Sequence, residues 1–130
     1  MAAYLHASAL VKLINAEPES AALRSWLLSK ERSPVTCDLA RTELVRAVRC
    51  LAPEQAPVAV HLLESVNVTE VTPAVFRAAG LVEPAALRSL VAIHLSAALD
   101  LGDDLHAFVT YDDRQTAAAT ANGISVIAPS

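Results

Sequence analysis

Hydrophobic positions follow two different periods along the chain, and together they predict strands that alternate with helices. Short continuous apolar runs predict strands at residues 2–5, 35–37, 66–71, 107–111 and 124–127. Apolar residues three or four positions apart predict helices over residues 8–16, 18–27, 39–51, 57–64, 73–79 and 84–101, and a short alanine-rich helix that ends at Asn122. This order predicts an α/β domain spanning residues 1–130, with a central parallel sheet of four to five strands covered by helices on both faces.

Polar residues at the helix ends support these boundaries. Ser8 and Asp38 are predicted N-caps, and Thr72 followed by Pro73 is typical of a helix start. The segment 84–101 is apolar on nearly all sides, so we expect it at the centre of the domain. Ligands bind beyond the carboxyl ends of parallel strands, and the ends of the strands 2–5, 35–37 and 107–111 bring His6, Asp38 and Asp112 into the expected site.

Composition and charge narrow the function classes. With only three glycines, the chain has no glycine-rich phosphate-binding loop. A formal net charge of -4 disfavours simple phosphate-tracking binding of nucleic acid, but it is compatible with an enzyme whose positive charge arrives as metal. Cys37 and Cys50 lack the spacing of a zinc site and indicate two buried thiols in a reducing compartment. No signal peptide or membrane span is evident, so we expect a cytoplasmic protein.

Four short motifs occur in a fixed order along the whole chain. They occupy residues 4–12, 38–47, 87–95 and 109–113. They resemble the four motifs of PIN-domain ribonucleases of the VapC toxin type, in which the first usually reads Leu-Asp-x-Ser/Thr-Ala-Leu, the third Leu-Asp-Ala-Ile-His-Leu and the fourth Thr-x-Asp. The resemblance implies a three-layer α/β/α PIN fold and a metal-dependent endoribonuclease that hydrolyses RNA, with tRNA or rRNA as the usual target.

The resemblance also assigns roles to individual residues. Glu43 and Asp112 are the implied catalytic acids and metal ligands, with Asp113 beside them, and the implied cofactor is Mg²⁺ or Mn²⁺ held through oxygen. Ser8 and Thr110 are expected to support the carboxylates by hydrogen bonds. Arg46 and Arg49 are the expected contacts to RNA phosphates.

Two positions depart from the family pattern. His6 stands where the first motif has aspartate, and Val91 where the third motif has aspartate. Valine binds no metal, and Mg²⁺ rarely accepts an imidazole nitrogen. We therefore expect weak Mg²⁺ binding and impaired activity.

The resemblance further implies a cognate VapB-type antitoxin, whose helical tail would contact Leu23, Trp26 and Leu27. Operator DNA would be reached only through that antitoxin, and the chain is expected to form a homodimer.

Other interpretations stay open on the sequence alone. Glu43 would also suit a surface ion pair with Arg46, and Asp112 would suit a helix N-cap. Leu23, Trp26 and Leu27 would suit an ordinary core stripe. His6 and His94 would suit hydrogen-bonded structural roles. At the level of function, the alternatives are an inactive PIN-fold module that sequesters an antitoxin, and a phosphoacceptor domain. The latter is disfavoured because His6 replaces the acidic pair expected after its first strand.

Overall fold

Five parallel strands form one sheet in the computed structural model, which describes residues 1–130. The strands are β1 (Ala2–Leu5), β2 (Ser33–Cys37), β3 (Asn67–Thr69), β4 (Leu105–Val109) and β5 (Val126–Ile127), in the spatial order β3-β2-β1-β4-β5. Every neighbouring pair is parallel. The prediction of a central parallel sheet in an α/β fold is therefore confirmed.

Strand β1 lies at the centre of the sheet and is buried along its whole length. Successive side chains of a strand point to opposite faces, so Ala3 and Leu5 face one layer of helices and Tyr4 faces the other. The ring of Tyr4 stacks on that of Phe108 in β4, with 5.0 Å between ring centroids. The centre of the sheet thus needs apolar residues on both faces, which explains the continuous apolar runs in the sequence.

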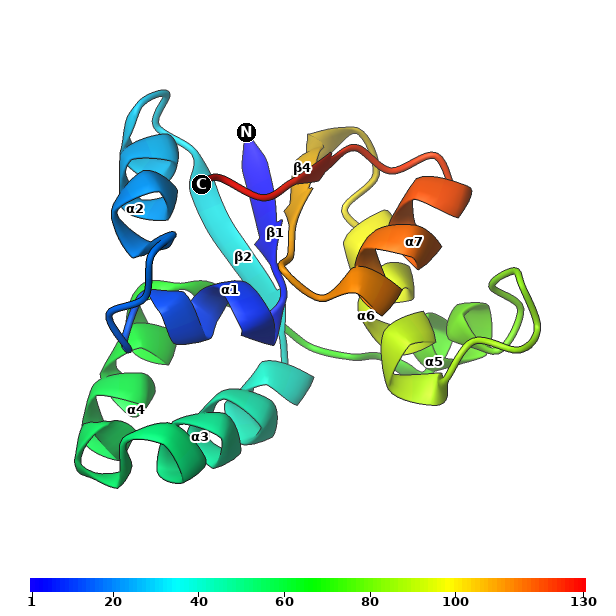
Figure 1. Cartoon of the computed structure of the whole chain (residues 1–130). Helices are drawn as coiled ribbons and strands as arrows, with labels where there is room; N and C mark the ends of the chain where they lie inside the picture. The colour runs from blue at the N-terminus through cyan, green and yellow to red at the C-terminus, as the bar shows by residue number, and fades with distance from the viewer.

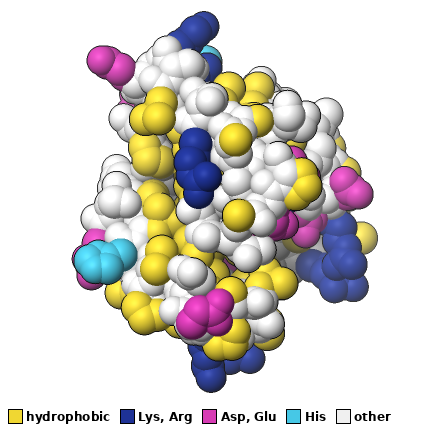
Figure 2. Space-filling view, turned by 60° about the vertical axis from the view of Figure 1, so that its left-hand side comes forward, with side chains coloured by type: hydrophobic (Ala, Val, Ile, Leu, Met, Phe, Trp, Pro, Cys, Tyr) yellow, Lys and Arg dark blue, Asp and Glu magenta, His cyan; other side chains and the backbone are white.

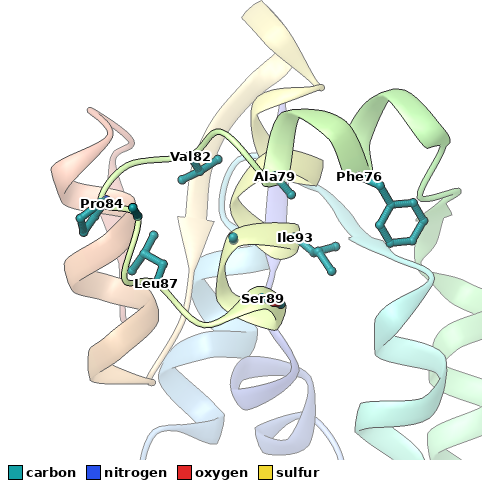
Figure 3. Close-up of a pocket in the computed structure, with 10 residues that line it drawn as sticks. Phe76, Ala79, Val82, Pro84, Leu87, Ser89 and Ile93 are labelled. Carbon is teal, nitrogen blue, oxygen red and sulfur yellow. The ribbon is translucent and has the colours of Figure 1, made fainter.

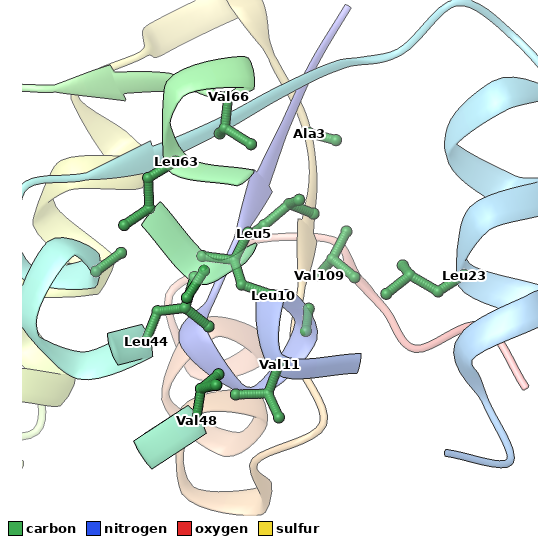
Figure 4. Close-up of a cluster of buried hydrophobic side chains, with 13 residues drawn as sticks. Ala3, Leu5, Leu10, Val11, Leu23, Leu44, Val48, Leu63, Val66 and Val109 are labelled. Carbon is green, nitrogen blue, oxygen red and sulfur yellow. The ribbon is translucent and has the colours of Figure 1, made fainter. Parts of the chain in front are cut away.

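Four helices cover one face of the sheet: α1 (Ala7–Lys12), α2 (Ser20–Leu28), α3 (Leu39–Leu51) and α4 (Ala56–Ser65). Figure 1 shows them together on one side of β1 and β2. Figure 4 shows the hydrophobic cluster under them, in which Leu10, Leu23 and Leu44 meet Leu5 and Val109 of the sheet. This layer positions α3, and therefore Glu43, at the carboxyl end of the sheet.

Three helices cover the opposite face: α5 (Pro73–Ala79), α6 (Ser89–Leu99) and α7 (Asp113–Ala121). Their core includes Leu95, Ala98 and Ala119, packed against Tyr4 and Phe108. The small alanine side chains let α6 and α7 approach the sheet closely. The molecule therefore has the predicted three layers, and no helix in it is both long enough and apolar enough to span a membrane.

Most predicted elements occur, with shifted ends. The helices predicted over 39–51 and 73–79 match α3 and α5, and Thr72 caps α5 by accepting a hydrogen bond from the backbone N–H of Val75. The predicted helix 8–16 is shorter and begins one residue earlier, because His6 and not Ser8 is its N-cap. Pro18 precedes α2 instead of lying in its first turn.

The largest boundary error concerns the segment predicted as a helix over 84–101. Residues 80–88 form a loop that joins α5 to α6, and helix begins only at Ser89. Arg88 has extended backbone angles, and Leu87 in the loop packs against the core of that layer. Leu87 is apolar because it packs in this core. Its position also fits the helical spacing, so the sequence predicted it as part of the helix.

Candidate functional site

A polar cleft opens at the carboxyl end of the sheet, with a volume of about 350 Å³. Side chains from four segments line it: His6 after β1, Glu43 of α3, Val91 of α6 and Asp112 after β4. Four of the five positions that the motif resemblance assigns to metal binding thus come together in one place. The remaining lining residues are Arg88, Ser89, Leu90, His94, Arg114 and Gln115.

The carboxylate of Glu43 is bound to a buried histidine. Oε1 of Glu43 lies 2.6 Å from Nε2 of His94, and Nδ1 of the same ring lies 2.8 Å from the phenol oxygen of Tyr4. Burial lowers the pKa of His94, but hydrogen bonds to Cys37 and Glu43 outweigh it and raise that pKa to about 9. His94 is therefore a cation at neutral pH that donates to Glu43. The alternative pairing of Glu43 with Arg46 is wrong, whereas the interpretation of His94 as a satisfied core histidine is confirmed.

His6 has its own hydrogen-bond network. Its Nδ1 accepts a hydrogen bond from the backbone N–H of Ser8 at 3.2 Å and lies 2.9 Å from the Ser8 hydroxyl. Burial, together with the neighbouring charge of His94, lowers the pKa of His6 to about 4. The ring is therefore neutral at pH 7, and because Nδ1 accepts, the proton resides on Nε2.

Ser8 and Thr110 link the ends of β1 and β4 below the cleft. Their hydroxyl oxygens are 3.2 Å apart, and the backbone N–H of Tyr111 donates to Ser8 Oγ at 3.0 Å. The backbone N–H of Asp112 donates to Thr110 Oγ1 at 3.1 Å. The two hydroxyls therefore fix the backbone that carries His6 and Asp112. Neither side chain is hydrogen-bonded to a carboxylate, so the expected direct support of the acids is wrong.

Asp112 caps the helix that follows it. Its Oδ1 accepts hydrogen bonds from the backbone N–H groups of Arg114 and Gln115 at 2.9 and 3.0 Å. The N-cap interpretation left open by the sequence is therefore correct, and Oδ2 is the only oxygen of this carboxylate without a hydrogen bond. Asp113 is exposed in the first turn of α7 and does not line the cleft.

The residues present do not fit a Mg²⁺ ion. Mg²⁺ requires near-octahedral oxygen ligands, and no three His, Cys, Asp or Glu side chains converge closely enough to hold a metal. One oxygen of Glu43 is bound to His94, one oxygen of Asp112 caps α7, and Val91 has no ligand atom. The remaining ring, His6, presents the protonated nitrogen Nε2, since Nδ1 is held by Ser8.

Several residues singled out in the sequence lie outside the cleft. Arg46 and Arg49 are exposed on α3 and border a separate hollow of about 240 Å³ with Cys50, which is exposed and not buried as predicted. The side chain of Asp38 makes no capping hydrogen bond. Its Oδ2 accepts instead from the backbone N–H of Val71, in the segment that follows β3.

Leu23 also differs from its predicted role. Its side chain is completely buried in the core, so it offers no surface to a partner and the prediction of direct contact is wrong. Trp26 and Leu27 are only partly buried, and the guanidinium of Arg32 covers one face of the Trp26 ring at 3.9 Å from its centroid. Two of the three predicted contact residues thus remain available on α2.

Arg88, Arg114 and Gln115 were missed as site residues by the motif reading. Arg88 lies three positions before Val91, and Arg114 and Gln115 lie two and three positions after Asp112. Arg88 thus lies inside the third motif, and Arg114 and Gln115 directly follow the fourth, so their positions were a signal that could have identified them. All three line the cleft.

A second cavity, of about 300 Å³, lies between α5, α6 and the loop that joins them (Figure 3). Phe76, Val82, Leu87 and Ile93 line it, and none of its lining residues carries a charge. This cavity therefore lacks the groups for acid–base or phosphate chemistry, and the polar cleft is the candidate site.

Comparison with known proteins gives a consistent result. The family model described as "PIN domain" matches residues 3–121. Ribonuclease VapC47 of Mycobacterium tuberculosis (strain CDC 1551 / Oshkosh) is 39% identical over 97% of this chain and 96% of its own length. Ribonuclease VapC46 of strain ATCC 25618 / H37Rv is 43% identical over 99% and 98%.

Two solved structures have a similar fold. Mycobacterium tuberculosis VapC20, a toxin that cleaves the sarcin-ricin loop, superposes with a TM-score of 0.77 at 17% identity, covering 98% of this chain and 99% of that one. VapBC2 of Rickettsia felis, bound to a DNA fragment from its promoter, gives a TM-score of 0.74 at 15% identity and full coverage of both chains. At these identities the superpositions support the fold alone.

Proposed function

Because the chain belongs to the PIN-domain family, as a VapC-type ribonuclease toxin, we propose that its substrate is RNA and that its hydrolysis of RNA is strongly impaired. The observation that carries the proposal is the composition of the cleft. Glu43 and Asp112 lie there together, but His6 and Val91 complete the set in place of carboxylates. The position of the cleft fits phosphodiester chemistry, whereas its ligands do not fit the Mg²⁺ or Mn²⁺ expected of the family.

Impairment has a direct physical cause. A catalytic metal lowers the pKa of bound water and stabilises charge on the phosphodiester, and oxygen ligands are what hold such an ion. In this chain Glu43 pairs with the His94 cation and Asp112 caps α7. Both acids therefore already have partners that stabilise the protein.

The first test compares the chain with its own Glu43→Gln variant. We expect both proteins to cleave tRNA and rRNA substrates at the same slow rate in Mg²⁺ or Mn²⁺, because a cleft that holds no metal gains little from the Glu43 charge. The measurement is single-turnover cleavage of labelled RNA. A wild-type rate far above that of Glu43→Gln would show that the site is active and contradict the proposed impairment.

A second candidate function is an inactive module that sequesters a cognate VapB-type antitoxin. The specific observation in its favour is the apolar surface on the α1–α4 layer. Figure 2 shows hydrophobic side chains along the face that carries α2 and α4, and Trp26 and Leu27 are incompletely buried there. Such a surface suits the apolar side of a partner helix. On this proposal, operator DNA is reached only through the antitoxin, as part of a complex.

Trp26→Ala tests the antitoxin contact. We expect it to weaken binding of the cognate antitoxin by about tenfold, because partly buried tryptophan is a frequent anchor of interfaces. Isothermal titration calorimetry gives the affinity. Phe76→Ala is the matched control, since Phe76 is half exposed but lies on α5, on the opposite face of the sheet. Equal affinities of the two variants would place the antitoxin elsewhere.

The remaining proposals concern location and assembly. A cytoplasmic protein fits the reducing environment inferred from Cys37 and Cys50, which form no disulfide. A homodimer fits the exposed hydrophobic side chains Leu81 and Leu90. The positions of Arg46 and Arg49 suit RNA phosphates that run past the cleft along α3.

A further inference from the structure

We propose that Arg88, Val91, Arg114 and Gln115 form a nucleotide subsite that binds a phosphate and its base without a divalent metal. It rests on the proposed function in one respect, which is that the ligand is RNA. Three observations carry it: two unpaired guanidinium groups, an apolar groove that joins the cleft, and a buried acceptor without a partner.

The two guanidinium groups are free to bind an anion. Arg88 precedes the first turn of α6 and Arg114 lies in the first turn of α7, so they approach the cleft from two different helices. Both side chains are exposed and line the cleft, and neither forms an ion pair or a side-chain hydrogen bond within the chain. Guanidinium groups bind phosphate oxygens through paired, charge-assisted hydrogen bonds.

The two guanidinium groups are the charged groups of the cleft without partners. The carboxylate of Glu43 is hydrogen-bonded to His94, and Oδ1 of Asp112 accepts from two backbone N–H groups of α7. Two further carboxylates at positions 6 and 91 would add negative charge beside the guanidinium groups, so the metal-free phosphate site is a consequence of this chain's own residues.

An apolar groove of about 500 Å³ continues from the cleft and shares Arg88, Val91 and Arg114 with it. The rest of the groove is formed mainly by small apolar residues, namely Pro84, Ala86, Leu87, Ala117, Ala118 and Ala121. Val91 is thus the junction between a charged site and an apolar one. A nucleotide likewise has a charged phosphate and a largely apolar base. When its phosphate is bound by the two arginines, its base can enter the groove.

Gln115 supplies an acceptor in the cleft, next to Val91. Its side chain is 1% exposed, and its Nε2 donates to the carbonyl oxygen of Val91 at 3.2 Å. Its Oε1 has no hydrogen-bond partner, which is costly for a buried polar atom. A hydroxyl or amino group of a nucleotide bound in the cleft would satisfy this oxygen.

The test is RNA binding in EDTA, followed by fluorescence anisotropy of a labelled hexauridylate. We expect binding, and we expect Arg88→Gln and Arg114→Gln each to weaken it about fivefold and to lower the salt dependence by about one phosphate contact. Arg77→Gln on α5 is the matched control, because it removes an exposed arginine outside the cleft and groove. No binding in EDTA, or equal affinities for all three variants, would overturn the proposal.

A competition experiment tests the groove. Uridine 5′-monophosphate is expected to displace the hexauridylate at a concentration about tenfold below that of inorganic phosphate, because only the nucleotide has a base to bury. Equal competition would overturn the groove as a base site. The assays contain neither metal nor antitoxin, so their failure is distinguishable from failure of the proposed toxin function, which is tested by cleavage and by antitoxin binding.

Discussion

The combined substitutions His6→Asp and Val91→Asp are expected to raise Mn²⁺-dependent RNA cleavage by at least a factor on the order of 100, since even the outer-shell partners of metal ligands change affinity or activity by roughly 10 to 100-fold. Both positions line the cleft that holds Glu43 and Asp112. The double variant therefore adds two hard oxygen ligands where the chain now has an imidazole and an isopropyl group.

The restored charge also changes the electrostatics of the cleft. In the unchanged chain, His6 is neutral and lies 4.9 Å from His94 between ring centroids. An aspartate at position 6 would face the His94 cation, and together with Glu43 it would surround one small volume with negative charge. Carboxylates that repel one another are stabilised by a divalent ion, so metal binding becomes favourable.

Two controls separate charge from packing. His6→Asn with Val91→Asn has nearly the same shape as the aspartate pair but no charge, and we expect it to gain no Mn²⁺ binding. Adding Glu43→Gln to the aspartate pair is expected to abolish most of the gain. Mn²⁺ binding is measured by calorimetry and cleavage by single-turnover kinetics. A double aspartate variant that binds no Mn²⁺ and cuts no RNA would rule out a PIN-type catalytic site in this cleft.

Val91 also connects catalysis with the proposed nucleotide subsite. The single substitution Val91→Asp places a negative charge at the junction of the cleft and the groove, both of which Arg88 and Arg114 also line. The substitution that contributes a ligand in the presence of Mn²⁺ therefore opposes phosphate binding in EDTA. On the proposed function, valine at position 91 thus favours phosphate binding over metal binding.

Much of the fold was predictable because local pattern and tertiary structure agree. The strands at the centre of the sheet are buried on both faces, so they read as continuous apolar runs. Helix α3 has a single apolar face that packs on α1 and α4, and its ends were predicted correctly. The motif order also predicted that Glu43, Asp112, His6 and Val91 would share one cleft.

The hydrogen-bond partners in the site were not predictable, because they join residues distant in sequence. Glu43 and His94 are 51 positions apart in the sequence. Their side chains meet only because α6 packs against the sheet. Spacing alone favoured the wrong partner, Arg46, three residues along the same helix. Similarly, the burial of Leu23 depends on how α2 lies over the sheet, since a helical stripe does not reveal which of its members is covered completely.

The substitution His94→Leu is expected to lower the free energy of unfolding by about 3 kcal/mol, because it removes one partner of a largely buried, hydrogen-bonded charge pair. His94 is 1% exposed, and its ring holds both the carboxylate of Glu43 and the phenol of Tyr4. Leucine fills a similar volume but leaves both oxygens without a donor. Urea denaturation measures the loss as a lower midpoint at an unchanged slope.

Two comparisons assign that loss to its cause. Tyr4→Phe removes only the hydroxyl of the Tyr4 ring and is expected to cost about 1 kcal/mol, as for one ordinary hydrogen bond. Glu43→Gln keeps a neutral acceptor for His94, and its effect should be non-additive with His94→Leu by about 1 kcal/mol, since residues in direct contact are energetically coupled. Additive effects would mean that the interaction between Glu43 and His94 contributes nothing to the free energy of unfolding. Glu43 would then be held in the cleft by the backbone of α3 alone, and its carboxylate would be free to bind a metal.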